Sequence, residues 1–198
     1  MGEGTHPYPG EISLAHQGIL YMDEISSYRK SILELIKLGM EQKFVNLNTL
    51  KYHKNYPADF TLIGTTNSSF SNTKLLTPSF LDRVDLQITL FKPNFKIEKQ
   101  KVDYGEVVNR INRANLFRKD RLATHPSTSV SNLIHLDRFL IEPKAKTVLQ
   151  RLRNQKYFSI RAIERSYRIA RTIADFEYSL LVGTVHLSEA ISLRGLSN

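Results

Sequence analysis

Two adjacent carboxylates follow a short apolar run near the start of the 198-residue chain. Asp23 and Glu24 come directly after residues 18–22, a run bounded by glycine and acid that predicts a strand buried on both faces in a parallel sheet. Phosphoryl transfer uses such a pair, because the first carboxylate can hold Mg²⁺ through water while the second orients or deprotonates the attacking water. A helix N-terminus that favours acids would also explain the pair, so both interpretations stay open on these residues alone.

Two further polar side chains follow apolar segments in the same part of the chain. Asn67 comes after a second predicted buried strand, residues 60–66, and a parallel sheet would place it beside the first strand's acids. Arg83 stands on a short predicted helical turn between apolar anchors, where it could reach the phosphate of a neighbouring molecule. The alternatives are an ordinary turn asparagine and a surface salt bridge from Arg83 to Asp82 or Asp85.

A second arginine and a basic hairpin are the remaining candidates. Arg161 lies in the first turn of a predicted helix capped by Ser159, a position that the helix macrodipole disfavours unless the arginine binds phosphate. Residues 44–56 alternate apolar and polar side chains and predict a hairpin with a polar tip. Its basic residues are Lys51, His53 and Lys54.

Strands and helices alternate to about residue 91, and helices alone follow, which predicts an α/β sheet with a small helical domain behind it. We place the domains at residues 1–93 and 94–198. A helix is expected over residues 27–40 with Ser26 or Ser27 as its cap, and a third strand through residues 86–90. The other helices are expected over residues 98–123, 144–154, 159–177 and 187–194.

Composition limits the possible partners. The chain has no cysteine, which excludes disulfides, thiolate metal sites and a cysteine nucleophile, so any metal must be held by oxygen or imidazole. The net charge of +9 favours polyanionic partners such as nucleic acid or nucleotides, although a soluble basic surface would give the same charge. No apolar run approaches the roughly 20 residues that span a bilayer, and the N-terminus has no signal-like pattern. We therefore expect a cytoplasmic protein without membrane contact.

These segments, in this order, resemble the magnesium-chelatase-like AAA+ ATPases, and specifically their ComM-type branch, which is linked to DNA uptake and recombination. The resemblance covers essentially the whole chain, and its most specific parts are PGEISLAHQG and the block from Arg161 to Asp175. The matching stretches are PGEISLAHQGILYMDEI for the hairpin and Walker B segment, LIGTTN for sensor 1, PSFLDRVDL for the arginine finger, and SIRAIERSYRIARTIADFE with VHLSEAISLR for the sensor 2 and lid helices.

The resemblance implies a role for each candidate residue. Asp23 and Glu24 correspond to the Walker B acids that serve Mg²⁺ and catalysis, and Asn67 corresponds to sensor 1. Arg83 corresponds to an arginine finger acting on ATP bound to a neighbour, and Arg161 to a sensor 2 residue that binds nucleotide. A ring oligomer is implied, in which the basic hairpin faces nucleic acid in a central pore.

The chain departs from the family pattern in two places. No G-x-x-x-x-G-K-[ST] motif occurs, so we expect a partial AAA+ core that lacks the phosphate loop, a truncated form or one half of a split protein, and little ATP binding or hydrolysis by the chain alone. A complementing subunit would then supply the missing loop. ComM-type members also carry cysteines shortly after sensor 1, where this chain has none.

Three functions remain open on the sequence. The leading one is a ComM-type ATPase piece that works with ATP and Mg²⁺ in a ring and acts on nucleic acid. The second is a non-catalytic module that binds nucleic acid or a protein partner and keeps only the fold. The third is the ATPase subunit of a porphyrin magnesium chelatase, which we rank lower because PGEISLAHQG and the RTIAD block look more like the ComM-type branch.

Overall fold

The computed structural model describes residues 8–48, 53–67, 76–90, 102–125, 140–154 and 159–195. The chain divides into two compact units, residues 1–83 and 84–198. The first unit is α/β and the second is helical. The boundary expected between residues 93 and 94 lies outside the described residues.

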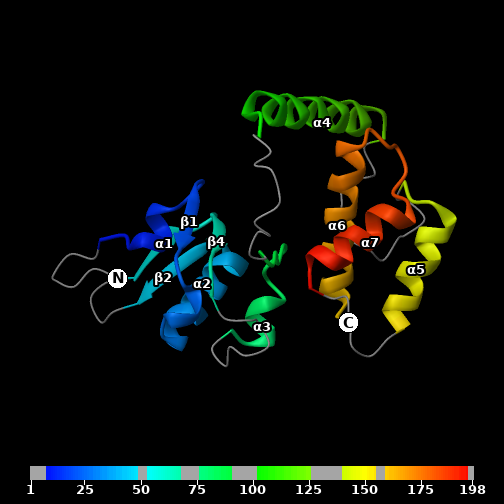
Figure 1. Ribbon diagram of the computed structural model, residues 1–198. Helices are drawn as coiled ribbons and strands as arrows, with labels where there is room; N and C mark the ends of the chain where they lie inside the picture. The colour runs from blue at the N-terminus through cyan, green and yellow to red at the C-terminus, as the bar shows by residue number, and fades with distance from the viewer. Residues whose placement is uncertain are drawn as a thin grey trace, which may run out of the picture. The chain divides into compact units, whose positions relative to one another are not determined.

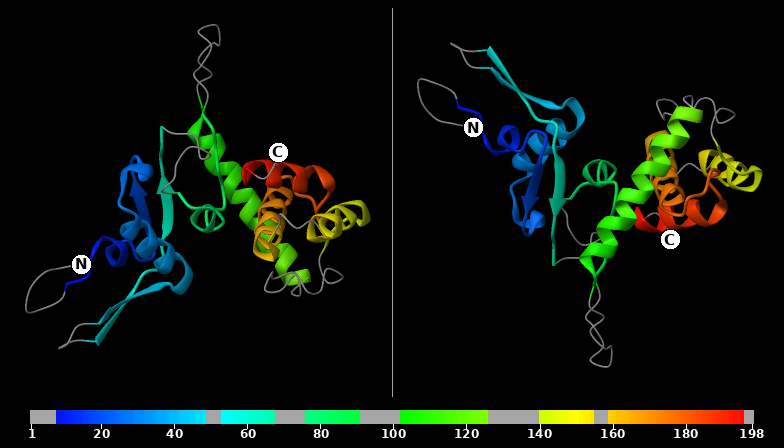
Figure 2. Two further views of the ribbon diagram at one scale, coloured as in Figure 1. Left: turned by 90° about the horizontal axis from the view of Figure 1, so that it is seen from below. Right: turned by 90° about the horizontal axis from the view of Figure 1, so that it is seen from above.

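The first unit contains one parallel and one antiparallel strand pair (Figure 1). Strand β1 (Ile19–Met22) pairs in parallel with β4 (Thr61–Gly64), in the register Ile19 to Thr61 and Met22 to Gly64. Strands β2 (Phe44–Asn48) and β3 (His53–Pro57) form the predicted hairpin, which extends away from the parallel pair (Figure 2). The parallel pairing matters most for function, because it brings the carboxyl ends of β1 and β4 to one edge.

Helix α2 (Lys30–Gln42) covers one face of the first unit through Leu33, Ile36 and Gly39. Gly39 allows a close approach, since a Cβ there would lie 3.2 Å from the ring of Phe60 and 3.3 Å from Ile12. The helix ends at Lys43, whose left-handed backbone lets its N–H donate to the carbonyl of Gly39 at 2.8 Å. The short helices α1 (Glu11–Leu14) and α3 (Pro78–Leu81) complete the unit.

Three details of the sequence prediction for residues 1–90 are wrong. The caps expected for α2 are not used, because Ser26 and Ser27 lie in a separate short 3₁₀ turn (Ile25–Ser27) and bond to Glu24 instead. The parallel strands are not buried on both faces, since Ile19 and Tyr21 are 62% and 60% exposed. No strand forms over residues 84–90.

The segment over residues 84–90 belongs to the second unit. Its Gln87 N–H donates to the carbonyl of Leu193 at 2.6 Å, at the end of the last helix. Leu86, Ile88 and Leu90 are 49%, 62% and 89% exposed, so the apolar alternation that predicted a strand is not buried against a sheet.

The described residues of the second unit contain four helices. They are α4 (Tyr104–Thr124), α5 (Pro143–Asn154), α6 (Ile160–Phe176) and α7 (Thr184–Leu193). Helix α6 is central: α7 packs along it, α5 lies beside both, and α4 crosses its C-terminal end (Figures 1 and 2). Ser159 caps α6 as predicted, accepting from the N–H of Ala162 at 3.0 Å. The core of the unit comprises Leu149, Ile163, Tyr167, Ala170, Ala174, Val182, Leu187 and Ala190.

Candidate functional site

The carboxyl ends of β1 and β4 gather the polar residues that the sequence singled out. Asp23 and Glu24 follow β1 directly, and Thr65, Thr66 and Asn67 follow β4. The pairing of the strands continues past their ends, because the N–H of Thr65 donates to the carbonyl of Met22 at 3.0 Å. The parallel register therefore fixes the two loops side by side.

Thr65 connects the two acids. Its hydroxyl donates to Oδ1 of Asp23 at 2.5 Å and accepts the backbone N–H of Glu24 at 3.0 Å. A second backbone bond, from the N–H of Ile25 to the carbonyl of Thr65 at 2.7 Å, holds the turn between them. A single threonine thus positions both the first carboxylate and the backbone of the second.

The Glu24 side chain accepts three donors. The hydroxyl of Thr66 lies 3.1 Å from Oε1, the N–H of Asn67 lies 3.1 Å from Oε2, and the hydroxyl of Ser26 also donates to Oε1. These bonds favour the ionised form, so the Ser26 hydroxyl first and the Asn67 N–H second lower the pKa of Glu24 below its ordinary value of 4.5. A carboxylate with a lowered pKa is a weaker base, which suits the orientation of a water better than deprotonation of it.

Glu24 adopts a left-handed backbone conformation, with φ 47° and ψ 58°. Such a conformation is uncommon for a residue with a side chain and costs on the order of 1–3 kcal/mol. It is what turns the chain after β1 and lets the Glu24 carboxylate face the residues that follow β4. The bonds from Thr65, Thr66 and Asn67 keep the chain in this conformation.

The donor set of this cluster fits Mg²⁺. Two carboxylates and neighbouring hydroxyl oxygens are hard oxygen ligands, and Mg²⁺ in phosphoryl-transfer sites takes only one or two carboxylates, with waters and phosphate oxygens completing its shell. Within the described residues no group of three or more His, Asp or Glu gathers into a closed metal cage. Asp23 is the better placed ligand of the two, since Glu24 already accepts three donors.

Arg83 contacts a different set of residues in the first unit. Its guanidinium forms an ion pair with Glu41 of α2, and it donates to the carbonyl and, at 3.1 Å, to the hydroxyl of Ser79. Of the two acids named as alternative partners, Asp85 pairs with Arg165 and Arg194 within the second unit. To reach a phosphate, Arg83 would have to exchange Glu41 for the anion.

The remaining candidates that the structure describes are exposed. Arg161 lies in the first turn of α6 with an exposed side chain, next to the Ser159 cap. His53 and Lys54 stand on β3 opposite Asn48 and Leu47, and both are exposed. Lys51 lies outside the described residues. The structure thus brings Asp23, Glu24 and Asn67 together. Arg83 contacts other residues of the first unit, and Arg161 belongs to the second unit.

Sequence reasoning missed the hydroxyls that brace the acid pair. Thr65, Thr66 and Ser26 supply three of its bonds, and the signal available was a pair of threonines directly before Asn67 at the end of a strand. Sequence reasoning also missed a buried ion network in the second unit, for which the spacing of Arg171 and Asp175 by one helical turn was the available signal.

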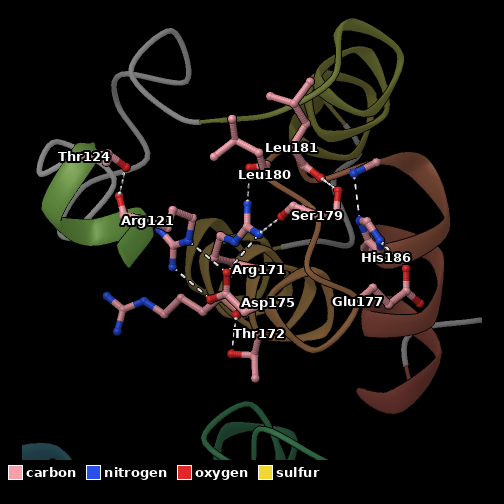
Figure 3. Close-up of polar contacts among 12 residues, drawn as sticks. Arg121, Thr124, Arg171, Thr172, Asp175, Glu177, Ser179, Leu180, Leu181 and His186 are labelled. Atoms are coloured by element: carbon pink, nitrogen blue, oxygen red, sulfur yellow. Dashed lines mark hydrogen bonds and ion pairs between the residues drawn. The ribbon is translucent and has the colours of Figure 1, made fainter. Parts of the chain in front are cut away.

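That network joins α4 to α6 (Figure 3). Asp175 accepts two parallel bonds of 2.8 Å from Arg121 and lies 3.0 Å from Nη2 of Arg171. Arg171 also donates to the carbonyls of Leu180, at 2.8 Å, and Ser179. Burial lowers the pKa of Arg171, and burial also raises the pKa of the neighbouring Tyr167 to about 12. The network is a structural clamp, because all three ionic side chains are at most 5% exposed.

Comparison with known proteins identifies the class of protein that this fold and site define. Residues 1–77 match the family described as magnesium chelatase, subunit ChlI, and residues 103–194 match its C-terminal family. Together the two matches cover most of the chain, and the helical unit agrees with the C-terminal family. The chain belongs to the magnesium-chelatase-like family.

Individual relatives place it within that family. It is 29% identical over 232 residues to the uncharacterised protein YifB of Salmonella typhimurium, and 27% identical over 218 residues to the competence protein ComM of Haemophilus influenzae. Each match covers 99% of this chain, but only 43% and 42% of the relative. The chain therefore spans about two-fifths of the length of these relatives. The resemblance to the ComM-type branch is confirmed.

Proposed function

We propose that this chain is the metal-side part of an ATPase that hydrolyses ATP in a ring and acts on nucleic acid. The observation that carries the proposal is the cluster of Asp23, Glu24 and Asn67 at the carboxyl ends of two parallel strands. Open α/β sheets bind their ligands at such carboxyl ends, so this edge is where a nucleotide and its metal would sit.

Each residue has a role in this chemistry. Asp23, bonded to Thr65 at 2.5 Å, would hold Mg²⁺ through water, and Glu24 would orient the attacking water. Asn67 fixes Glu24 through its backbone N–H, and its side-chain amide would contact the γ-phosphate or that water. Mg²⁺, when bound, would neutralise the charge that develops on the transferred phosphoryl group.

Two arginines would complete the site from elsewhere. Arg83, released from Glu41, would contact ATP held by a neighbouring subunit, and Arg161 would contact phosphate from the helical unit. A guanidinium suits both tasks, since it stays charged and presents a planar fork of donors to phosphate oxygens.

Binding of the phosphates would also need a phosphate loop, which these 198 residues do not contain. None of the 198 residues forms a G-x-x-x-x-G-K-[ST] loop, whose backbone N–H groups cradle the β- and γ-phosphates. A complementing subunit or another ring member would supply it, and the chain alone would hydrolyse ATP very slowly. The relative named as a competence protein supports an action on nucleic acid. In this proposal, Lys51, His53 and Lys54 of the hairpin face the nucleic acid.

Mixing experiments test the proposal. Purified chain is added to a family member that carries a phosphate loop, and ATP hydrolysis and co-assembly are measured by coupled assay and light scattering. We expect co-assembly and a changed rate of ATP hydrolysis. The Arg83→Ala variant is expected to co-assemble, but kcat at the sites that Arg83 would serve should fall by about 10³-fold or more, the usual effect of removing an arginine finger. Asp59→Asn, which removes an exposed partner of Lys43, is the control. If the two proteins do not co-assemble and the rate of hydrolysis does not change, the proposal is contradicted and a non-catalytic module is favoured.

A further inference from the structure

An open groove of about 650 Å³ runs along α6 in the helical unit. Its lining includes Arg161, Arg165, Arg168 and Thr172 of this helix. These positions follow the spacing i, i+4, i+7 and i+11, which places them on one narrow stripe of a helix. Three guanidiniums therefore line the groove in a row, followed by Thr172, whose hydroxyl donates to the carbonyl of Arg168 at 3.1 Å.

The groove is basic but not uniformly so. Asp85 lies 2.5 Å from Nη1 of Arg165 and 3.6 Å from Nη1 of the buried Arg194, and its own side chain is 60% exposed. Glu164 is the second acid that lines the groove. Because Asp85 is exposed and bonded to a groove arginine, it occupies the position that an incoming anion would take.

The length of the groove and its apolar lining indicate which kind of ligand it fits. The stripe from Arg161 to Thr172 extends about 16 Å at the rise of an α-helix. That is longer than one phosphate group needs, and it matches several nucleotides of a strand, which advances about 3.4 Å per nucleotide in a duplex and more when extended. Apolar side chains also line the groove, among them Ile173 and Phe176, and Phe176 is 36% exposed, so its ring is accessible for stacking with a base.

We propose that this groove binds the sugar–phosphate backbone of single-stranded nucleic acid. Arg165 and Arg168 contact successive phosphates, Phe176 stacks with a base, and Asp85 is displaced from Arg165 when the strand enters. The inference rests on the proposed action on nucleic acid, and it adds a binding site on the helical unit that is separate from the basic hairpin of the first unit.

Fluorescence anisotropy with a labelled 15-nucleotide oligothymidylate tests the groove. We expect Arg165→Gln and Arg168→Gln each to raise the Kd several-fold and to lower the slope of log K against log salt by about 0.7, the value for one lost contact to a single strand. Asp85→Asn is expected to lower the Kd, because it removes the competing carboxylate. Arg110→Gln and Arg113→Gln are the matched controls, since both change the same charge on exposed positions of α4 and lie outside the groove.

The possible outcomes separate this inference from the proposed function. Unchanged binding and salt slope in Arg165→Gln and Arg168→Gln, with binding lost in Lys54→Gln, would overturn the groove and leave the action on nucleic acid standing. Displacement of the oligonucleotide by Mg·ATP at equal concentration would show a mononucleotide site instead and would also overturn it. No binding of the oligonucleotide by the wild-type chain would overturn both proposals. Thermal unfolding of every variant confirms that its helices are intact.

Discussion

Asp175 and Glu24 are both carboxylates that accept several hydrogen bonds, but they lie in opposite environments. Asp175 is 5% exposed and bonds to two arginines of the helical unit, so its charge is compensated in place. Glu24 follows a strand near the surface, and its donors are two hydroxyls and one backbone N–H, none of which carries a charge. The donors to Glu24 leave its negative charge uncompensated, so a cation can use it, whereas the carboxylate of Asp175 is already neutralised by two buried arginines.

The largest effect is expected from the buried side of this comparison. Asp175→Asn leaves Arg121 and Arg171 facing each other without a carboxylate, and removing one member of a buried ionic network costs about 3–5 kcal/mol. Urea unfolding followed by circular dichroism measures the change. Glu189→Gln, an exposed acid on α7, is the control, and we expect it to stay within about 0.5 kcal/mol of wild type. Equal effects of the two substitutions would show that the network is not a clamp.

A smaller effect is expected at Glu24, and its sign follows from the lowered pKa. Between the folded pKa and the ordinary value of 4.5, the unfolded chain binds more protons than the folded one, so stability rises with pH. The contribution of Glu24 is therefore fully present above pH 4.5 and is lost as the pH falls through the lowered pKa.

NMR titration of the Glu24 carboxyl carbon measures that pKa directly. We expect an inflection below 4.5 that moves upward in Ser26→Ala, because the Ser26 hydroxyl is the largest cause of the shift. Ser13→Ala, a serine of α1, is the control and should leave the inflection in place. An inflection at or above 4.5 in the wild-type chain would contradict the geometry described for this cluster.

Much of the candidate site could be predicted from the sequence because parallel strands have a simple geometry. Two apolar runs, each followed by polar residues, place Asp23, Glu24 and Asn67 at one edge as soon as the runs pair in parallel. What could not be predicted is how Glu24 turns. Its left-handed backbone depends on bonds to Thr65 and Thr66, which are more than 40 residues away in sequence and meet Glu24 only in the folded chain.

The fold shows the same division between local and distant causes. Helix α6 and its Ser159 cap were predictable because the periodic apolar face and the cap are both local. The strand expected over residues 86–90 fails, because alternation alone does not supply a neighbouring strand, and Gln87 bonds to Leu193 instead. The partner of Arg83 could not be predicted either, because Glu41 lies on a helix that approaches Arg83 only in the folded chain.

Metal binding at the acid cluster is the most direct test of the account. Mn²⁺ replaces Mg²⁺ at oxygen sites and broadens the NMR signals of nearby nuclei, so it reports even weak binding by the chain alone. We predict that low concentrations of Mn²⁺ broaden the amide signals of Asp23, Glu24 and Thr65 first, and that Asp23→Asn abolishes this while Asp59→Asn does not. Broadening that begins at other acids, or that persists unchanged in Asp23→Asn, would contradict the assignment of this cluster as the metal side of a nucleotide site.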